Sequence, residues 1–587
     1  MGEPAAGVGG RGHADVALDR FFEVFYRHRP VTATFTGLHD HDGRLPDWSP
    51  DGLAGSRDEM TAQRARLRAA GCPADDDVRT FPLDVDLALA DAVLDIAVAE
   101  HDSGHFVHSN PSLWTGEAIF GVLSLLTRDF APLAERLPRA RARLQAVPRF
   151  LGALPDVLGP APRDWRGRAK RECSVARDLF GSALPGWLTA LRSADPALCT
   201  DGDLAEWTAA STAAAEAFGG LEAWLEAPAT PRTTLRAVYA HEYVGTDFLE
   251  LLLRRGHWVD TPAADLLLEA SDALTEARAR LEEMAAPHGG WPAVQDALAG
   301  QHPTAETWLG RFHQRWLECR DAAERADLVT WPDAPLRYVP FPEHVRAAAP
   351  QLYYLHYRSP APFDPVGTFD YVVAPLDGLS GAETEARLRQ WNDSVITLNH
   401  VVHHGAIGHH VQNHHAYRGA SRIGRVAAVD AANRISMFVG GSLAEGWACY
   451  VCDLMDEIGF LTPLEAIAQQ HTRVRLAARA VADLSLHTGR LTMVTASLIY
   501  EDHAFMASPA AQAEVLRNSM FPGAAVMYWL GTRAIHRLRA EAGRREGAAF
   551  SLRRFHDRFL SYGAIPVPLI ARLMLDRQAG PAGETAS

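Results

Sequence analysis

Seven histidines stand within sixteen residues of this chain, between positions 400 and 415. Neutral imidazole is the commonest protein ligand for transition metals, so metal chemistry is expected first in this segment. The candidate ligands are His400, His403, His404, His409, His410, His414 and His415.

The spacing of these histidines leaves the ligand pair open. On a regular α-helix each residue advances by about 100°, so residues four or seven apart share a face. His403 and His409 diverge by about 120° on such a helix, unless Gly405 and Gly408 distort it. The pairs that satisfy the regular spacing are His400 with His404, His403 with His410, and His410 with His414.

The elements that must position these histidines are mostly α-helices. Apolar residues recur at three-to-four residue spacing over long Ala/Leu/Arg/Glu stretches, which predicts a multi-helical protein. We expect helices over 16–28, 84–100, 131–151, 205–225, 263–286 and 442–458, with a further helix from about 382 into the histidine segment. Strands are expected only at 369–374 and 336–342, next to that helix. We divide the chain into an N-terminal helical region, 1–230, and a site-bearing region, 231–587.

Composition narrows the class of protein. Hydrophobic residues make up 47% and charged residues 22% of the 587 residues, as in ordinary globular proteins. The net charge of −15 argues against nucleic acid and anionic membrane as partners, because both need a basic surface. Six dispersed cysteines do not resemble a disulfide framework, and no secretory or membrane-spanning segment is visible. We therefore expect a cytoplasmic protein with a small-molecule substrate, of oligomeric state that the sequence does not indicate.

Several motifs occur in an order that resembles a known family. The chain is similar to bacterial domain-of-unknown-function family 885, whose members are regarded as metallopeptidases of the gluzincin type. Its start, at 30–47, is also similar to that of the family, so the resemblance covers nearly the whole chain. The matching stretches are His403–Gln412, Glu445–Tyr450 (E-G-W-A-C-Y), Arg475–His487, Glu514–Arg517 and Pro522–Tyr528.

The resemblance implies a mostly α-helical, gluzincin-like fold with a deep central cleft and a small β-element beside the metal helix. It assigns His403, His409 and Glu445 as metal ligands, with Zn²⁺ as the metal and Fe²⁺ or Mn²⁺ as alternatives. Two histidines and a carboxylate with an open fourth position are typical of catalytic zinc sites. The alternative for Glu445 is a carboxylate at a helix N-terminus, satisfied by backbone amides.

His404 departs from the family at its most important position. In gluzincins a glutamate follows the first histidine, takes a proton from the attacking water and passes it to the leaving amine. Imidazole can act as a base near neutral pH, but its shape differs and it can itself bind metal. Efficient peptide hydrolysis is therefore not expected.

Other departures indicate a repurposed site. Ile407 replaces a proline, Cys452 a glutamate, Ser485 a glycine and Trp529 a lysine. The missing lysine suits a substrate without the carboxylate that a peptidase must hold.

Further candidates each have a structural alternative. Tyr528 could stabilise an oxyanion and His487 could do the same or move protons, but each could equally be a buried, hydrogen-bonded core residue. Cys449 and Cys452 are expected to be buried thiols, with Cys449 on the face of Glu445. His241-Glu242 imitates a zincin motif without a second histidine at the required spacing. Tyr353, Tyr354, His356 and Tyr357 either line the cleft or pack as aromatic residues.

Our first interpretation is a metal-dependent enzyme that carries out hydrolysis, elimination or cyclisation on a small, partly apolar metabolite. His404, His487 or Tyr528 would handle protons. Three alternatives stay open. They are a zinc peptidase or amidase with His404 as base, a non-catalytic binding protein on the same scaffold, and an iron or manganese site with His404 as an additional ligand.

Overall fold

The computed structural model describes residues 8–227, 242–341, 357–358, 361–364, 368–428 and 435–576. Helices dominate this part of the chain, which confirms the mostly α-helical class. None of these helices combines the length and apolarity needed to cross a membrane. The predicted boundary near 230 lies outside the described residues, so the division into 1–230 and 231–587 stays a prediction.

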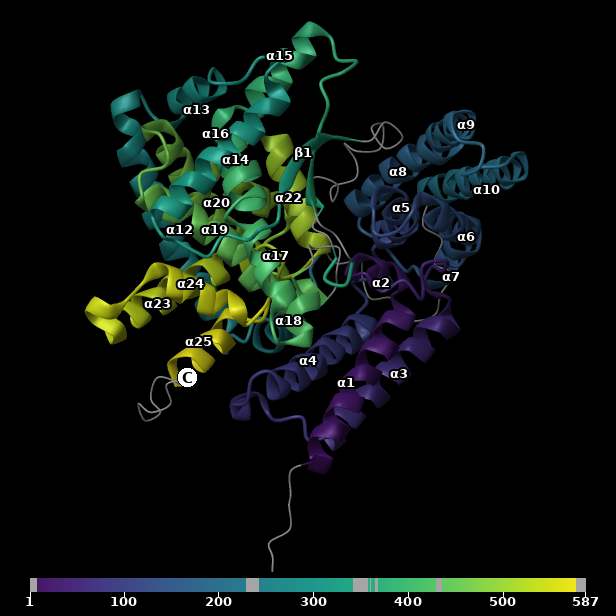
Figure 1. Ribbon diagram of the computed structural model, residues 1–587, viewed down its shortest axis with the longest axis horizontal. Coiled ribbons are helices and arrows are strands. Elements are labelled where there is room, and N and C mark those ends of the chain that lie inside the picture. The colour runs from purple at the N-terminus through teal and green to yellow at the C-terminus, as the bar shows by residue number, and fades with distance from the viewer. Residues whose placement is uncertain are drawn as a thin grey trace, which may run out of the picture.

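The N-terminal helices form the purple and blue part of Figure 1. The helices expected over 84–100, 131–151 and 205–225 are found as α4, α6 and α10, with bounds that differ by at most four residues, and the one expected over 16–28 begins earlier, at Val8. They are α1 (Val8–His28), α2 (Pro30–Thr36), α3 (Pro50–Ala69), α4 (Leu83–Asp102), α5 (Pro111–Thr127), α6 (Leu133–Gly152), α7 (Leu154–Val157), α8 (Arg163–Asp178), α9 (Leu184–Ala194) and α10 (Asp201–Glu226).

The remaining helices follow residue 242, and α14, α16 and α19 among them contact the histidine segment. Among them, α20 begins with a capping box in which Thr462 and Glu465 bond each other's backbone N–H, with Pro463 at its first position. They are α11 (Thr246–Leu251), α12 (Ala263–Ala285), α13 (Trp291–Ala299), α14 (Trp308–Arg325), α15 (Gly381–Gln390), α16 (Asp393–Val395), α17 (His409–Arg418), α18 (Arg422–Val426), α19 (Gly441–Glu457), α20 (Pro463–His487), α21 (Met493–Ala504), α22 (Ser508–Met520), α23 (Val526–Glu546), α24 (Leu552–Ser561) and α25 (Val567–Asp576).

One small sheet lies beside the histidine segment, as expected. Its strands are β1 (Leu336–Pro340), β2 (Tyr357–Arg358) and β3 (Phe369–Val373), in the order β1-β3-β2. β3 pairs in parallel with β1 and antiparallel with β2. The hydroxyl of Tyr371, on the central strand, and Nδ1 of His400 form a hydrogen bond of 2.6 Å. This bond connects the sheet to the histidine segment.

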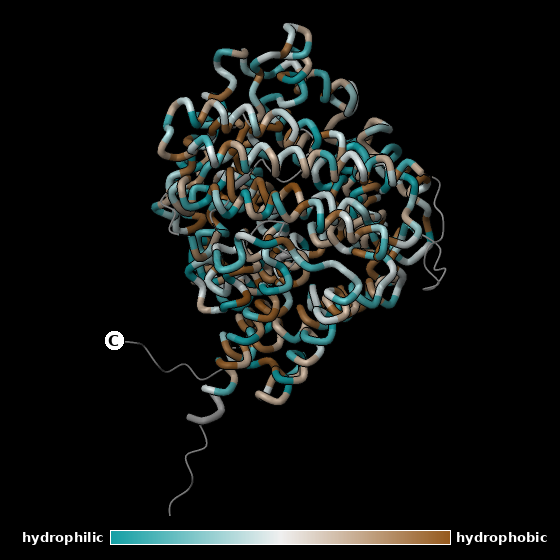
Figure 2. Tube along the Cα trace, turned by 90° about the vertical axis from the view of Figure 1, so that its right-hand side faces the viewer, coloured by the Kyte–Doolittle hydropathy of each residue, from teal (hydrophilic) through white to brown (hydrophobic). Residues whose placement is uncertain are grey.

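The hydrophobic core crosses the predicted region boundary. One buried cluster joins Phe21 and Val93 of the N-terminal helices to Val401 and Ile570 of the C-terminal ones. A second cluster fills the bundle of α5, α6, α8 and α10, and a third lies among α12, α20 and α21. In Figure 2 the hydrophobic stretches of the trace accordingly gather toward the interior.

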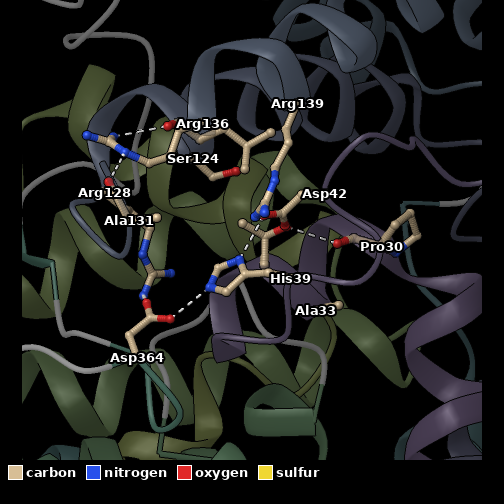
Figure 3. Close-up of polar contacts among 12 residues, drawn as sticks. Pro30, Ala33, His39, Asp42, Ser124, Arg128, Ala131, Arg136, Arg139 and Asp364 are labelled. Atoms are coloured by element: carbon tan, nitrogen blue, oxygen red, sulfur yellow. Dashed lines mark hydrogen bonds and ion pairs between the residues drawn. The ribbon is translucent and has the colours of Figure 1, made fainter. Parts of the chain in front are cut away.

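A buried polar cluster also connects the two parts of the chain. His39 lies between Asp42 and Asp364, with its ring nitrogens 2.8 Å and 2.9 Å from their carboxylate oxygens (Figure 3). Arg128 and Arg139 approach the same two carboxylates at 3.6 Å and 3.2 Å. The loop after α2 is thereby fixed to the segment that precedes β3.

Candidate metal centre

The histidine segment is not a regular α-helix. Residues Ile396–Gly405 form a π-helix, labelled η6, and α17 begins only at His409. In the break between them, Ala406 N–H donates to the carbonyl of Val401 at 2.7 Å and Gly408 N–H to that of Val402 at 2.9 Å. A Cβ on Gly408 would lie 1.8 Å from the carbonyl oxygen of His403, so only glycine fits here. The wide turn and the break bring the rings of His403 and His409 to a centroid distance of 4.9 Å.

Two buried tryptophans hold the break. Trp316 Nε1–H donates to the carbonyl of Gly405 at 2.6 Å, and Trp447 Nε1–H donates to that of Ile407 at 2.9 Å. These bonds satisfy carbonyls that the interrupted helix leaves without backbone donors. Trp447 of the E-G-W-A motif therefore positions the histidine segment.

The neighbouring residues of the same motif position the carboxylate. Glu445 lies on α19 one residue before Gly446, where a Cβ would lie 2.6 Å from Cα of Gly531 on α23. The two glycines let α19 and α23 pack with their backbones close together. Tyr528, about one turn before Gly531, lines the same cavity as Glu445.

His403, His409 and Glu445 converge with the geometry of a metal site. Nε2 of His403 lies 3.4 Å from Oε2 of Glu445, and Nε2 of His409 lies 3.6 Å from the same oxygen. Ligands bonded to tetrahedral zinc at 2.0–2.2 Å are about 3.3–3.6 Å apart. Oε2 of Glu445 is buried, and no hydrogen-bond partner reaches it within the described residues. The donor set that the family resemblance implied therefore fits a zinc ion.

The pKa shifts of His403 and Glu445 favour the protonation states that bind a metal. Burial and the nearby His409 lower the pKa of His403, although Glu445 partly offsets them. Burial would raise the pKa of Glu445, but His409 and His403 outweigh it and hold that pKa well below its usual range. Neutral imidazoles and an ionised carboxylate are the forms that bind metal.

His404 lies beside the same centre. One ligand atom each of His403, His404 and His409 lies within 4.8 Å of the others, and the rings of His403 and His404 are 4.5 Å apart. Nδ1 of His404 bonds the carbonyl of Asn399 at 2.7 Å. A carbonyl can only accept, so Nδ1 carries the hydrogen and Nε2 is the acceptor in the neutral ring. Burial and the two other histidines lower the pKa of His404 well below its usual value.

A cavity of about 1250 Å³ lies beside this centre. Its lining includes His403, His404, Glu445 and Tyr528, together with both thiols, Cys449 and Cys452. Cys449 Sγ lies 4.0 Å from Nδ1 of His403, whereas Glu445 lies nearest the other ring nitrogen, Nε2, and burial raises the pKa of this thiol.

His487 does not line this cavity. It is fully buried on α20, where its Nε2–H donates to the carbonyl of Asn518 at 3.0 Å and its Nδ1 accepts from Val244 N–H at 3.3 Å. Burial lowers the pKa of His487 to about 4. Because both ring nitrogens serve the packing of α20, we leave His487 out of the proposed chemistry.

The other histidines of the segment contact protein groups. Nδ1 of His400 bonds Tyr371, and its ring stacks on Trp391 at 4.3 Å. Nε2 of His410 and Nε2 of His415 bond the carbonyls of Ala334 and Thr330, and Nδ1 of His414 contacts Arg418. None of the last three lines the cavity.

Several sequence candidates lie outside the described residues, namely His241, Tyr353, Tyr354 and His356. Glu242, the second residue of the zincin-like pair, accepts a hydrogen bond from Met493 N–H at 3.4 Å.

Sequence reasoning assigned no role to Arg475, Arg479 and Arg517, although all three line the cavity. The signal was present in the four-residue spacing of Arg475 and Arg479, which places both on one face of a helix. The direction in which that face points depends on tertiary packing, which the spacing does not specify.

The model of a bacterial family of proteins of unknown function, DUF885, matches residues 30–574. The chain belongs to the DUF885 family. Two solved structures share its fold. One, described as "a putative lipoprotein of unknown function from Shewanella oneidensis", is 22% identical with a TM-score of 0.73, over 95% of this chain and 99% of that one. The other, described as "the putative lipoprotein from Colwellia psychrerythraea", is 16% identical with a TM-score of 0.72, over 97% and 99%.

At these identities the likeness establishes the fold alone. No curated protein matches the chain. The gluzincin-type architecture and the peptidase ancestry that the motifs of this DUF885 member implied stay predictions.

Proposed function

We propose that this DUF885 member is a zinc-dependent enzyme that acts on a small, partly apolar molecule. The observation that carries the proposal is the position of Glu445 Oε2, 3.4 Å from Nε2 of His403 and 3.6 Å from Nε2 of His409. His403 and Glu445 also line a large cavity. Zinc held by these residues would supply a Lewis acid for a substrate oxygen.

The chain's own residues would position the substrate and move its protons. Nε2 of His404 is the acceptor nitrogen, fixed by the bond from Nδ1–H to Asn399, and could take a proton from a group bound in the cavity. The hydroxyl of Tyr528 could donate to a developing oxyanion. The reaction class that suits this set is hydrolysis, elimination or cyclisation.

The first experiment is metal analysis of the full chain purified without a histidine tag. We expect about one zinc ion per chain, as in sites with two histidines and a carboxylate. Protein that contains only trace metal, and takes up none when zinc is added, would contradict the proposal and favour a non-catalytic binding protein.

The second experiment asks whether His404 explains the departure from peptidase chemistry. Peptide and amide substrates are assayed with the unmutated protein and with His404→Glu, and His414→Glu on the outer part of α17 is the matched control. Activity gained only by His404→Glu supports a repurposed site. Removal or restoration of a general base typically changes a rate by about 10²–10⁴-fold.

A zinc amidase with His404 as base is the second candidate, favoured by the orientation of its acceptor nitrogen. Amide hydrolysis by the unmutated protein that His404→Glu does not increase would select it. A third arrangement, with His404 as a further ligand of iron or manganese, is favoured by the 4.8 Å grouping of the three histidines. Metal analysis separates it from both zinc alternatives.

The cytoplasmic location stays part of the proposal. The two relatives of known structure are each described as a "putative lipoprotein", which suggests an envelope location as the alternative. Fractionation of the native host would distinguish the two locations.

A further inference from the structure

One wall of the cavity is strongly basic, although the chain as a whole is acidic. The sequence has 57 basic and 72 acidic side chains, for a net charge of −15. Arg475 and Arg479 of α20 and Arg517 of α22 nevertheless line the same cavity as Glu445. A basic wall in a low-dielectric cavity concentrates anions there.

Two of the three guanidinium groups approach the carboxylate of one glutamate. Glu514 of α22 lies 2.6 Å from Arg479 and 3.5 Å from Arg475. Burial would raise the pKa of Glu514, but Arg479, Arg475 and Arg517 outweigh it and lower that pKa to about 2. The carboxylate is therefore ionised, and it pairs with two of the three guanidinium groups that line the cavity.

This basic group is adjacent to the proposed chemistry. The guanidinium carbon of Arg479 lies 4.9 Å from the centre of the Tyr528 ring. Tyr528 packs in turn with Leu476 and with Cys449, the thiol that contacts His403. A group bound to Arg475 and Arg517 would thus lie in the same cavity as the atoms that would react.

Other parts of the cavity lining are aromatic. Trp391 stacks on His400 at 4.3 Å, and Trp291 stacks on His471 at 4.2 Å. Both tryptophans line the cavity, as do Phe341 and Tyr371. A substrate with an anionic group and an apolar ring or chain would match both kinds of surface.

We propose that Arg475, Arg479 and Arg517 form an oxyanion subsite, so that the substrate is a small acid with a carboxylate or phosphate attached to an apolar group. Guanidinium groups bind such oxyanions in a bidentate manner, more specifically than lysine does. That such an acid is also the substrate of a reaction rests on the proposed function, but its binding to the three arginines does not. It reverses the expectation, drawn from Trp529 in place of a lysine, that the substrate lacks a carboxylate.

The test is calorimetric titration of the full chain with three probes of similar shape. Phenylacetate and phenyl phosphate carry the two oxyanions, and phenylacetamide is the neutral counterpart. At low salt, at least one of the anions should bind at least about tenfold more tightly than the amide, as expected for hydrogen bonds to charged groups. Whichever anion binds more tightly identifies the oxyanion.

Matched variants locate the binding. Arg475→Gln and Arg517→Gln should each weaken binding of that anion about tenfold or more and leave the amide unchanged. Arg475→Lys, which keeps the charge but not the planar fork, should lose part of the affinity. Arg537→Gln is the control, because this side chain is 68% exposed on α23 and outside the cavity. Thermal unfolding followed by circular dichroism verifies that each variant is folded.

The titrations are repeated on protein depleted of metal by a chelator. A preference for the anion that persists without metal supports the arginine subsite, even if the protein proves to have no metal-dependent activity. A preference that appears only with zinc would assign the anion to the metal and overturn the inference. Equal affinity for all three probes, or binding of none, would also overturn it.

Discussion

Glu445 is the residue on which the proposed metal centre depends most. Its Oε2 is the atom that both histidine nitrogens approach. We expect Glu445→Gln to weaken zinc binding by more than about 100-fold, the upper end of what the loss of an outer-shell partner costs. Competition with a chromophoric chelator would measure the affinity.

Cys449→Ala provides the comparison for Glu445→Gln. It removes only the thiol 4.0 Å from Nδ1 of His403, so the loss of zinc affinity should fall within about 10–100-fold. An equal loss in the two variants would mean that Glu445 acts on the site from outside and is not a ligand.

A second prediction at the scale of residues concerns Gly408. In Gly408→Ala the new Cβ would lie 1.8 Å from the carbonyl oxygen of His403, so the break must shift and His403 with it. We expect loss of stability together with loss of zinc affinity, measured by urea unfolding and by zinc titration.

Gly310→Ala is the control for Gly408→Ala. Nothing lies within 4 Å of a Cβ on Gly310, which is inside helix α14. Helix propensity predicts a gain of up to about 1 kcal/mol for this variant. Normal zinc affinity in Gly408→Ala would show that the break does not position His403.

The identity of the candidate ligands could be predicted from sequence motifs, but the close approach of their side chains in space could not. On a regular α-helix His403 and His409 diverge, and the adjacent His403 and His404 point about 100° apart. The π-helix and the break place all three rings together. This conformation depends on Trp316 and Trp447, which are distant in sequence, so the local spacing could not indicate it.

At the scale of elements, the E-G-W-A motif connects three parts of the site. It supplies the carboxylate of Glu445, the close approach to α23 at Gly446, and the indole that bonds the break in the histidine segment. Helix positions followed from apolar spacing because that spacing reports burial directly. The faces on which Arg475 and Tyr528 act depend on how α19, α20 and α23 pack together.

Trp447→Phe tests the contact between α19 and the break. The variant leaves the buried carbonyl of Ile407 without its indole donor, at a cost of about 1–3 kcal/mol. We expect lower stability in urea and weaker zinc binding, because His409 follows directly after the break.

Trp224→Phe on α10 is the control for Trp447→Phe. Trp224 packs against the N-terminal core cluster, so this variant should leave zinc affinity unchanged. If Trp447→Phe lowers stability while zinc binding stays normal, the indole supports packing but does not position the ligand.

At the scale of the whole molecule, the N-terminal helices and the metal centre belong to connected structures. A single core cluster runs from Phe21 to Ile570, and the His39 cluster fixes the loop after α2 to Asp364, ahead of β3. Sequence patterns predicted the N-terminal helices but could not pair His39 with a residue 325 positions away. Such a contact requires the complete fold.

The His39 cluster makes the stability of the whole molecule depend on pH. Burial alone would lower the pKa of His39, but Asp364 and Asp42 outweigh it and raise that pKa from 6.5 to about 9. Since the folded-state pKa exceeds the unfolded one, the stabilisation is complete below pH 6.5 and is lost as the pH rises through 9. Burial lowers the pKa of Arg143, which lies 3.9 Å from Asp42, to about 10, so this guanidinium titrates above most of the range over which His39 loses its proton. Allowing for solvent screening, we expect the free energy of unfolding to fall by about 1–2 kcal/mol between those limits.

Chemical unfolding of the unmutated protein and of His39→Gln across this pH range would measure this loss. The variant should be less stable than the unmutated protein at pH 6.5 and should lack this part of the slope. Parallel curves for the two proteins would show that the imidazolium of His39 does not hold the two parts of the chain together.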